Sequence, residues 1–131
     1  DGPNMLELQR RYPDVLFTGA KHGEELSLYY TSADVFVFPS LTDTFGLVQL
    51  EALASGLPVA AFPVPGPLDV IGDRPVGCLD EDLGKACENA LTVDRNECRE
   101  YAAQHSWVEC ARLFRSYLEV LPTDATQVRV G

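Results

Sequence analysis

Residues 34 to 61 read DVFVFPSLTDTFGLVQLEALASGLPVAA, and this stretch decides the fold class. It begins with an almost continuous apolar run, Asp34 to Pro39, which is typical of a strand buried on both faces of a parallel sheet. The run from Phe45 to Gly56 has the length and composition of a helix closed by glycine, and PVAA then starts another apolar strand. This succession of strand, helix and strand predicts a doubly wound α/β sheet.

The same alternation of strand and helix extends on both sides of this stretch. Upstream, Val15 to Gly19 (VLFTG) is a short β-rich run, and Gly23 to Ser32 has helical spacing with two glutamates in its first turn. Downstream, we expect one helical turn in GPLDVIGD (66–73) and a short edge strand in VGCLD (76–80). With a short helix in MLELQRRY (5–12), the pattern predicts four strands before the chain becomes all helical.

The C-terminal third predicts three helices in succession, EDLGKACENAL, DRNECREYAAQH and SWVECARLFRSYLEVL. Asp94 and Ser106 suit the N-caps of the last two, since Asp and Ser side chains accept hydrogen bonds from free amides. We expect one domain over residues 1–121 and a polar tail over 122–131. Because the chain opens with a loop and a helix, we also expect the sheet to lack its first strand or strands, which would leave an edge open to dimerisation or aggregation.

Composition excludes several classes of function. The chain has 10 Lys and Arg against 20 Asp and Glu, a net charge of −10, which repels nucleic acids and anionic membranes at long range. It has neither a basic start followed by an apolar core nor the run of about 18 apolar residues that a membrane span needs, so we expect a cytoplasmic protein. Four cysteines without a CxxC pair, and only two histidines, favour reduced packing cysteines over a metal site.

The candidate site begins where the strand at 34–39 is followed by the helix at 45–56. The first backbone amides of a helix have no internal partner and point outward at the positive end of the helix dipole, which suits an anion. Gly46 in the first turn would allow a diphosphate to approach closely. The residue alone leaves a second interpretation equally open, in which Gly46 only allows the helix and the strand to pack closely.

Glu51 and Asp43 are the candidate acidic residues of this site. The neighbours of Glu51 three and four residues away on the helix are apolar or small, so its carboxylate must meet solvent, a cation or ligand hydroxyls. Glu51 could instead lie on a narrow solvent-facing strip, and Asp43 could instead cap the helix. At a rise of 1.5 Å per residue the two carboxylates stand roughly 12 Å apart, which suits contacts with two parts of one ligand and excludes a catalytic dyad.

The pattern PS..D.FGLV.LEA.ASG.PVAA closely resembles the retaining glycosyltransferases of family 4, the group 1 class with the GT-B fold. Their hallmark is an acidic pair spaced E-x7-E, and Asp43 and Glu51 have this interval with Asp in place of the first Glu. The resemblance covers Asp1 to about Leu121. The chain looks most like bacterial members that transfer sugars, including mannose, to lipids or polysaccharides.

The resemblance implies a two-domain enzyme in which residues 1–121 form most of the Rossmann-like C-terminal domain, while the N-terminal acceptor domain lies outside this chain. Such an enzyme transfers a hexose from a nucleotide sugar, GDP-mannose or a UDP-sugar, to a lipid or saccharide acceptor with retention. No metal ion or other cofactor is expected. Membrane contact would be peripheral and made only through the missing domain, and the isolated chain is expected to be inactive.

Carried over position by position, the resemblance implies that Glu51 holds the ribose hydroxyls and that Asp43 contacts hydroxyls of the donor sugar, the two positions nearest the chemistry. It also implies a base-binding turn and a stretch that meets the sugar and the diphosphate, in part through backbone amides. The turn consists of Gly19, Ala20 and Lys21, and the stretch consists of Thr44, Phe45, Gly46, Leu47 and Val48.

Two departures from the family pattern bear on activity. Asp43 is one methylene shorter than Glu, so the sugar contact is weaker, displaced or matched to another sugar. The family neutralises the leaving diphosphate with an upstream Arg and Lys, whereas residues 22 to 73 here hold no cation. A catalytically silent nucleotide-binding or interaction module is therefore the alternative function. The resemblance implies that acceptor-activating residues lie largely on the other domain, so no general base is assigned here. His22 follows the base-binding turn, but a loop histidine is more often solvated.

Overall fold

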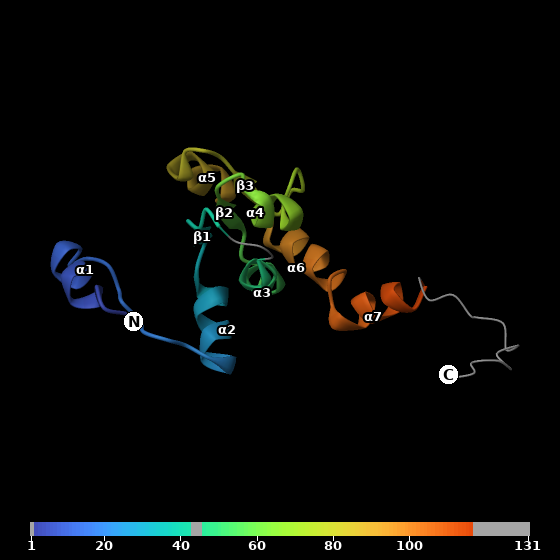
Figure 1. Cartoon of the computed structure of the whole chain (residues 1–131), viewed down its shortest axis with the longest axis horizontal. Helices are drawn as coiled ribbons and strands as arrows, with labels where there is room; N and C mark the ends of the chain where they lie inside the picture. The colour runs from blue at the N-terminus through green and yellow to red at the C-terminus, as the bar shows by residue number, and fades with distance from the viewer. Residues whose placement is uncertain (1, 43–45, 117–131) are drawn as a thin grey trace, which may run out of the picture.

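Three short parallel strands form the sheet at the centre of the fold: β1 (Phe36–Phe38), β2 (Val59–Ala61) and β3 (Gly77–Leu79) (Figure 1). The computed structural model describes residues 2–42 and 46–116, apart from the side chains of residues 107, 109, 110, 113 and 114. β2 lies between β1 and β3 and pairs in parallel with both. The predicted parallel α/β sheet is confirmed, and the predicted tail at 122–131 lies outside the described residues.

The described residues form seven helices. They are α1 (Met5–Arg11), α2 (Gly23–Ser32), α3 (Leu47–Ala54), α4 (Pro65–Val70), α5 (Leu83–Ala90), α6 (Arg95–Ala103) and α7 (Trp107–Ser116). The predicted helical turn, edge strand and three C-terminal helices correspond to α4, β3 and α5 to α7. As predicted, Asp94 caps α6, because its carboxylate accepts a hydrogen bond of 2.8 Å from the amide of Asn96.

The side chains of β2 divide the core into two layers, because successive residues of a strand point to opposite faces of the sheet. Val59 lies in the larger cluster, with Leu53 of α3 and Cys98 of α6. Ala60 lies in a smaller cluster with two buried alanines of α5. One face of the sheet is therefore covered by α3 and α6 and the other by α5, as a doubly wound fold requires.

The prediction of a strand at Val15–Gly19, the first of the four expected, is wrong. This segment connects α1 to α2 without strand pairing, and the side chains of Val15 and Leu16 are 55% and 80% exposed. A β-rich run becomes a strand only where a neighbouring strand takes up its backbone hydrogen bonds and covers its side chains. No strand formed by the described residues does so, since β1 pairs with β2 alone.

The side of the sheet beyond β1 combines an open edge with an apolar surface. Within the described ranges no strand pairs with the outer edge of β1, although this strand is apolar at every position. α1 and α2 bury no residue, and Leu6, Leu16 and Leu28 are each at least 66% exposed. Edges of this kind accept further strands. The open edge of β1 therefore fits the expectation that strands outside these residues complete the sheet.

Arg95 of α6 holds the C-terminal end of α2. Its guanidinium donates hydrogen bonds of 2.8 Å and 3.0 Å to the carbonyl oxygens of Ala33 and Thr31. A cation is favourable there because the last carbonyls of a helix form the negative end of its dipole. The same end of α2 carries Tyr30, whose ring meets the ring of Phe36 edge-on at 5.7 Å. These contacts position Tyr30 beside the start of β1.

Three cysteines have described side chains, and all three are free thiols, as predicted. Cys78 and Cys87 are half-buried, and Cys98 is fully buried. The thiol of Cys98 donates to the carbonyl oxygen of Val76 at 3.6 Å. The side chain of Cys110 lies outside the described residues. The described cysteines therefore serve the packing of the core.

The free energy of unfolding should fall as the pH rises above 9.0, in part because of Cys98. Burial, with a smaller contribution from the negative charge of Asp94, raises the pKa of the Cys98 thiol from 9.0 to about 11. The folded chain holds this proton more tightly than the unfolded chain, so its stabilising effect is complete below pH 9.0 and is lost as the pH passes through about 11. Urea denaturation at a series of pH values measures the decline.

The matched variant for this measurement is Cys98→Ala, which should show a shallower decline over the same pH range. Tyr30 and Tyr101 contribute to both proteins, because burial also raises the pKa of each of these hydroxyls. Equal slopes in the two proteins would therefore contradict a role for the Cys98 thiol.

Candidate functional site

The carboxyl ends of the three strands lie along one edge of the sheet, because the strands are parallel. α3, α4 and α5 each begin shortly after one of these ends, so three helix starts follow this edge. The first amides of a helix have no internal partner, which makes each start a candidate position for an anion. The residues at each start decide whether its amides are free.

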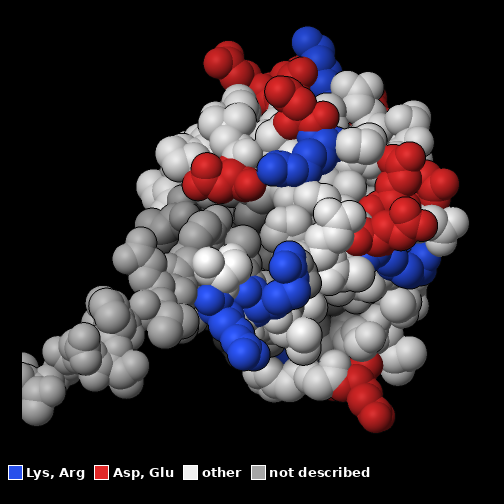
Figure 2. Space-filling model, turned by 90° about the vertical axis from the view of Figure 1, so that its right-hand side faces the viewer, with Lys and Arg blue, Asp and Glu red and all other residues white. Residues whose placement is uncertain are grey.

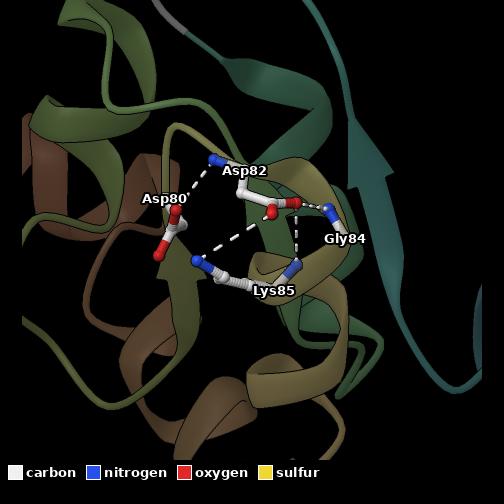
Figure 3. A network of polar contacts seen from close by, with 4 residues as sticks. All are labelled: Asp80, Asp82, Gly84 and Lys85. Atoms are coloured by element: carbon white, nitrogen blue, oxygen red, sulfur yellow. Dashed lines mark hydrogen bonds and ion pairs between the residues drawn. The ribbon is translucent and has the colours of Figure 1, made fainter.

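The starts of α4 and α5 offer few free amides. α4 has 6 residues, and two of its first three are prolines, which supply no N–H. At α5, the carboxylate of Asp82 accepts hydrogen bonds from the amides of Gly84 and Lys85, at 3.0 Å and 3.4 Å (Figure 3). The amide of Asp82 donates in turn to the carboxylate of Asp80 at 2.7 Å. The side chains of this turn therefore occupy the amides that an anion would need.

Among the described residues, nothing occupies the start of α3. Gly46 is its N-cap residue, and no described side chain caps the helix. The carbonyl oxygen of Gly46 accepts the amides of Gln49 and Leu50, at 2.9 Å and 3.3 Å. No hydrogen bond between described residues engages the amides of Leu47 and Val48. Of the three helix starts along this edge, only the start of α3 has amides that no described residue engages. Three predicted donor-binding residues, at positions 46 to 48, lie there.

Three further predicted site residues, Asp43, Thr44 and Phe45, lie outside the described residues. The interpretation of Asp43 as a sugar contact, and the alternative of Asp43 as a helix cap, both stay predictions. α3 packs through Ala52 and Leu53 on its buried face. This packing is therefore compatible with either role of Asp43.

Glu51 lies on the solvent-facing side of α3. Its side chain is exposed and makes no ion pair with a described residue. α3 does not bury this carboxylate, because the helix packs against α6 and the sheet through its other face. Glu51 therefore lies on a solvent-facing strip, and its contact with ribose hydroxyls stays a prediction. An exposed carboxylate needs no internal partner, so Glu51 is free to bind a ligand without a cost in folding.

Sequence reasoning missed Tyr30, which lies near Glu51. Burial raises the pKa of the Tyr30 hydroxyl, and the negative charge of Glu51 raises it further. Tyr30 belongs to α2 and Glu51 to α3, so this proximity depends on how the two helices sit against β1. No local pattern in the sequence could have indicated it.

Sequence reasoning also missed Gln49, which is fully buried on α3. Neither polar atom of its side-chain amide has a hydrogen-bond partner among the described residues. A signal was present in the sequence, since Gln49 stands three residues after Gly46, at the position from which Glu or Gln side chains reach back to a helix start.

The predicted base-binding turn, Gly19, Ala20 and Lys21, precedes α2. Gly19 has a φ of +69°, a left-handed conformation that glycine adopts without strain. Lys21 pairs with Glu25 at 2.5 Å, and its ammonium lies 5.3 Å from the centre of the Tyr29 ring. In Figure 1 this turn lies at the end of α2 that points away from the sheet. The structure therefore does not bring it beside the start of α3, and its role at the base stays a prediction.

The two histidines do not contribute to the start of α3. His22 is exposed at the N-cap of α2 and makes no capping hydrogen bond, as a solvated histidine would. His105 contacts its own helix region, with Nδ1 3.0 Å from the carbonyl oxygen of Tyr101. Within residues 2–42 and 46–116, no group of three or more His, Cys, Asp or Glu side chains is arranged to hold a metal ion.

Charge is unevenly distributed along the chain. Residues 22 to 73, which include α3, contain seven acidic residues and no Lys or Arg. Figure 2, which looks onto the right-hand side of Figure 1, shows a group of basic side chains in the middle of that face with carboxylates around it. Because residues 22 to 73 contain no Lys or Arg, this segment can bind an anion only through neutral hydrogen-bond donors.

Comparison with known proteins identifies a family for this chain. The family model described as glycosyl transferases group 1 matches residues 1–106. A GDP-mannose-dependent alpha-mannosyltransferase of Corynebacterium glutamicum is 36% identical over 133 residues, which cover 92% of this chain and 32% of that protein. A protein of the same description from Mycolicibacterium smegmatis is 39% identical over 131 residues, which cover 92% of this chain and 35% of that protein.

A relative of a different description also matches. An alpha-monoglucosyldiacylglycerol synthase of Streptococcus pneumoniae is 39% identical over 108 residues, which cover 74% of this chain and 24% of that protein. The chain spans about a third or less of the length of these three relatives.

Proposed function

Because this chain belongs to the group 1 glycosyl transferases, we propose that it forms most of the donor-binding domain of an enzyme that transfers a sugar from a nucleotide sugar. The observation that carries the proposal is the open start of α3 at the carboxyl edge of the sheet. The diphosphate of the donor binds there, at the amides of Leu47 and Val48, and Gly46 allows it to approach. Glu51, one turn further along, accepts hydrogen bonds from the ribose hydroxyls.

In this proposal the chain stabilises charge rather than transferring protons. Transfer breaks the bond between the anomeric carbon and the phosphate oxygen, forms a bond from that carbon to the acceptor oxygen, and leaves the electron pair on the diphosphate. Fixed N–H dipoles stabilise the growing negative charge. Asp43 holds hydroxyls of the sugar during this step. The acceptor, and the group that takes its proton, belong to the rest of the protein.

The donor we propose is GDP-mannose, with a UDP-sugar as the second candidate, and the acceptor is a lipid or a saccharide. Two of the relatives are named for GDP-mannose, which supports that donor, and a third is named as an alpha-monoglucosyldiacylglycerol synthase, which supports a lipid acceptor. We propose retention at the anomeric carbon and no metal ion or other cofactor, since amide donors serve the diphosphate.

The partner of this domain is an N-terminal acceptor domain of the same protein, which fits the short coverage of the relatives. No helix in the described part of the chain is long and apolar enough to cross a membrane. We propose that any membrane contact is peripheral and made by the acceptor domain. Free thiols at Cys78, Cys87 and Cys98 fit a cytoplasmic location.

Calorimetric titration of the chain with GDP and then UDP, at low salt, with and without magnesium, tests the donor site. One base should bind with a dissociation constant below about 1 mM, equivalent to roughly 4 kcal/mol, and magnesium should not change it. Absence of heat with both nucleotides, from a chain shown by circular dichroism to be folded, would contradict a donor site within these residues.

A catalytically silent nucleotide-binding module is the second candidate function. The absence of Lys and Arg from residues 22 to 73 favours it, because a leaving diphosphate is usually met by cations as well as amides. An assay of the full-length protein with GDP-mannose and with UDP-sugars separates the two. Sugar transfer supports the enzyme, whereas nucleotide binding without transfer to lipid or saccharide acceptors supports the silent module.

A further inference from the structure

Gln49 has a buried amide group that the fold itself does not use. Its side chain is 0% exposed, and neither Nε2 nor Oε1 has a hydrogen-bond partner among the described residues. A buried amide without a partner costs stability, and buried polar groups in native proteins are nearly always hydrogen-bonded. A group left in this state needs a ligand or a water to account for it.

The amide lies against the start of α3. A Cβ atom placed on Gly46 would collide with Nε2 and Cδ of Gln49, so the amide occupies the space beside the Gly46 backbone. Gln49 is the third residue of α3, from which a side chain can reach back along the helix to its first turn. The unused donor and the free amides of Leu47 and Val48 therefore belong to the same helix start.

The charge of this segment makes a further neutral donor valuable. An anion at the start of α3 meets no Lys or Arg from residues 22 to 73, and the nearby Glu51 is negative. The backbone amides and the Gln49 amide are the donors that α3 itself can offer. A glutamine side chain has three rotatable bonds, so Nε2 can turn toward the anion without a movement of the helix.

We propose that Gln49 is a donor-binding residue whose Nε2–H group donates a hydrogen bond to the diphosphate held at the start of α3. This inference rests on the proposed function, because it takes the diphosphate as the ligand of that start. It explains both the buried unpartnered amide and the glycine at position 46, where any side chain would displace it.

The test compares the wild-type chain with Gln49→Met, which keeps the length and volume of the side chain and removes the amide. The dissociation constant for the nucleoside diphosphate that the wild type binds should rise about tenfold. The urea midpoint should stay equal or rise, because an unpartnered buried amide has been removed. Leu53→Met, on the buried face of the same helix, is the matched control and should leave the dissociation constant unchanged.

The outcomes separate this inference from the proposed function. If the wild type binds a nucleoside diphosphate and Gln49→Met binds it equally well, the inference fails and the proposed function stands. A lower urea midpoint for Gln49→Met would show that the amide is bonded within the folded chain, which also overturns the inference. If the folded wild type binds neither GDP nor UDP, the proposed donor site fails and the inference fails with it.

Discussion

Replacing Glu51 with glutamine should weaken the binding of a nucleoside diphosphate by roughly 10- to 100-fold, which corresponds to about 1.5 to 3 kcal/mol. The substitution keeps the size of the side chain but removes the negative charge that strengthens hydrogen bonds from the ribose hydroxyls. Stability should not change, because the side chain is exposed and has no ion pair with a described residue. Calorimetric titration and urea denaturation measure the two quantities.

The control for this variant is Glu88→Gln, which removes the same charge from an exposed position on α5. Glu88 lies on a different helix from the proposed site, so the variant changes the net charge without removing a ligand contact. Its dissociation constant for the nucleotide should therefore equal that of the wild type. If Glu51→Gln and Glu88→Gln have the same dissociation constant for the nucleotide, Glu51 makes no contact with the ligand. Glu51 is then only an exposed residue of α3.

Leu53→Ala should lower the free energy of unfolding by about 2 to 5 kcal/mol, the range for a buried leucine whose cavity stays partly open. Leu53 is 0% exposed and lies in the larger core cluster with Val59 and Cys98, so it joins α3 to the sheet and to α6. A loss of this size is a large part of the stability of a small domain. Urea denaturation followed by circular dichroism measures it.

The comparison for this variant is Leu68→Ala on α4, where the leucine is 46% exposed. Its cost should be well below that of Leu53→Ala, because much of the side chain is already in contact with water. Equal losses in the two variants would mean that α3 does not pack through Leu53 in solution. The donor site would then lack the support that the structure gives it.

Local sequence patterns predicted most of the elements correctly. The apolar runs at 34–39 and 58–61 contain β1 and β2. β2 is buried at every position, as an apolar run in a parallel sheet predicts, whereas β1 was wrongly predicted to be buried on both faces, because Val37 is 44% exposed. The cap at Asp94 was predictable because its hydrogen bond spans only two residues. The open start of α3 was also indicated, since glycine follows a strand there.

The predictions that failed depended on residues far away in the chain. Val15–Gly19 has the composition of a strand, but a strand needs a partner, and no described strand provides one. Helical spacing around Glu51 indicated a helix with apolar neighbours on several sides, and it could not indicate which side faces the sheet. Packing through Leu53 decided that, and it turned Glu51 to solvent.

By itself, the sequence determined the order of strands and helices from Gly23 onward and the position at which an apolar strand is followed by a glycine-started helix. These features depend on residues within a few positions of each other. Only the tertiary structure decided that Glu51 is exposed near Tyr30 and that the Gln49 amide is buried without a described partner. The reason is that burial and hydrogen bonding depend on which distant side chains the fold brings to α3, and local periodicity carries no information about them.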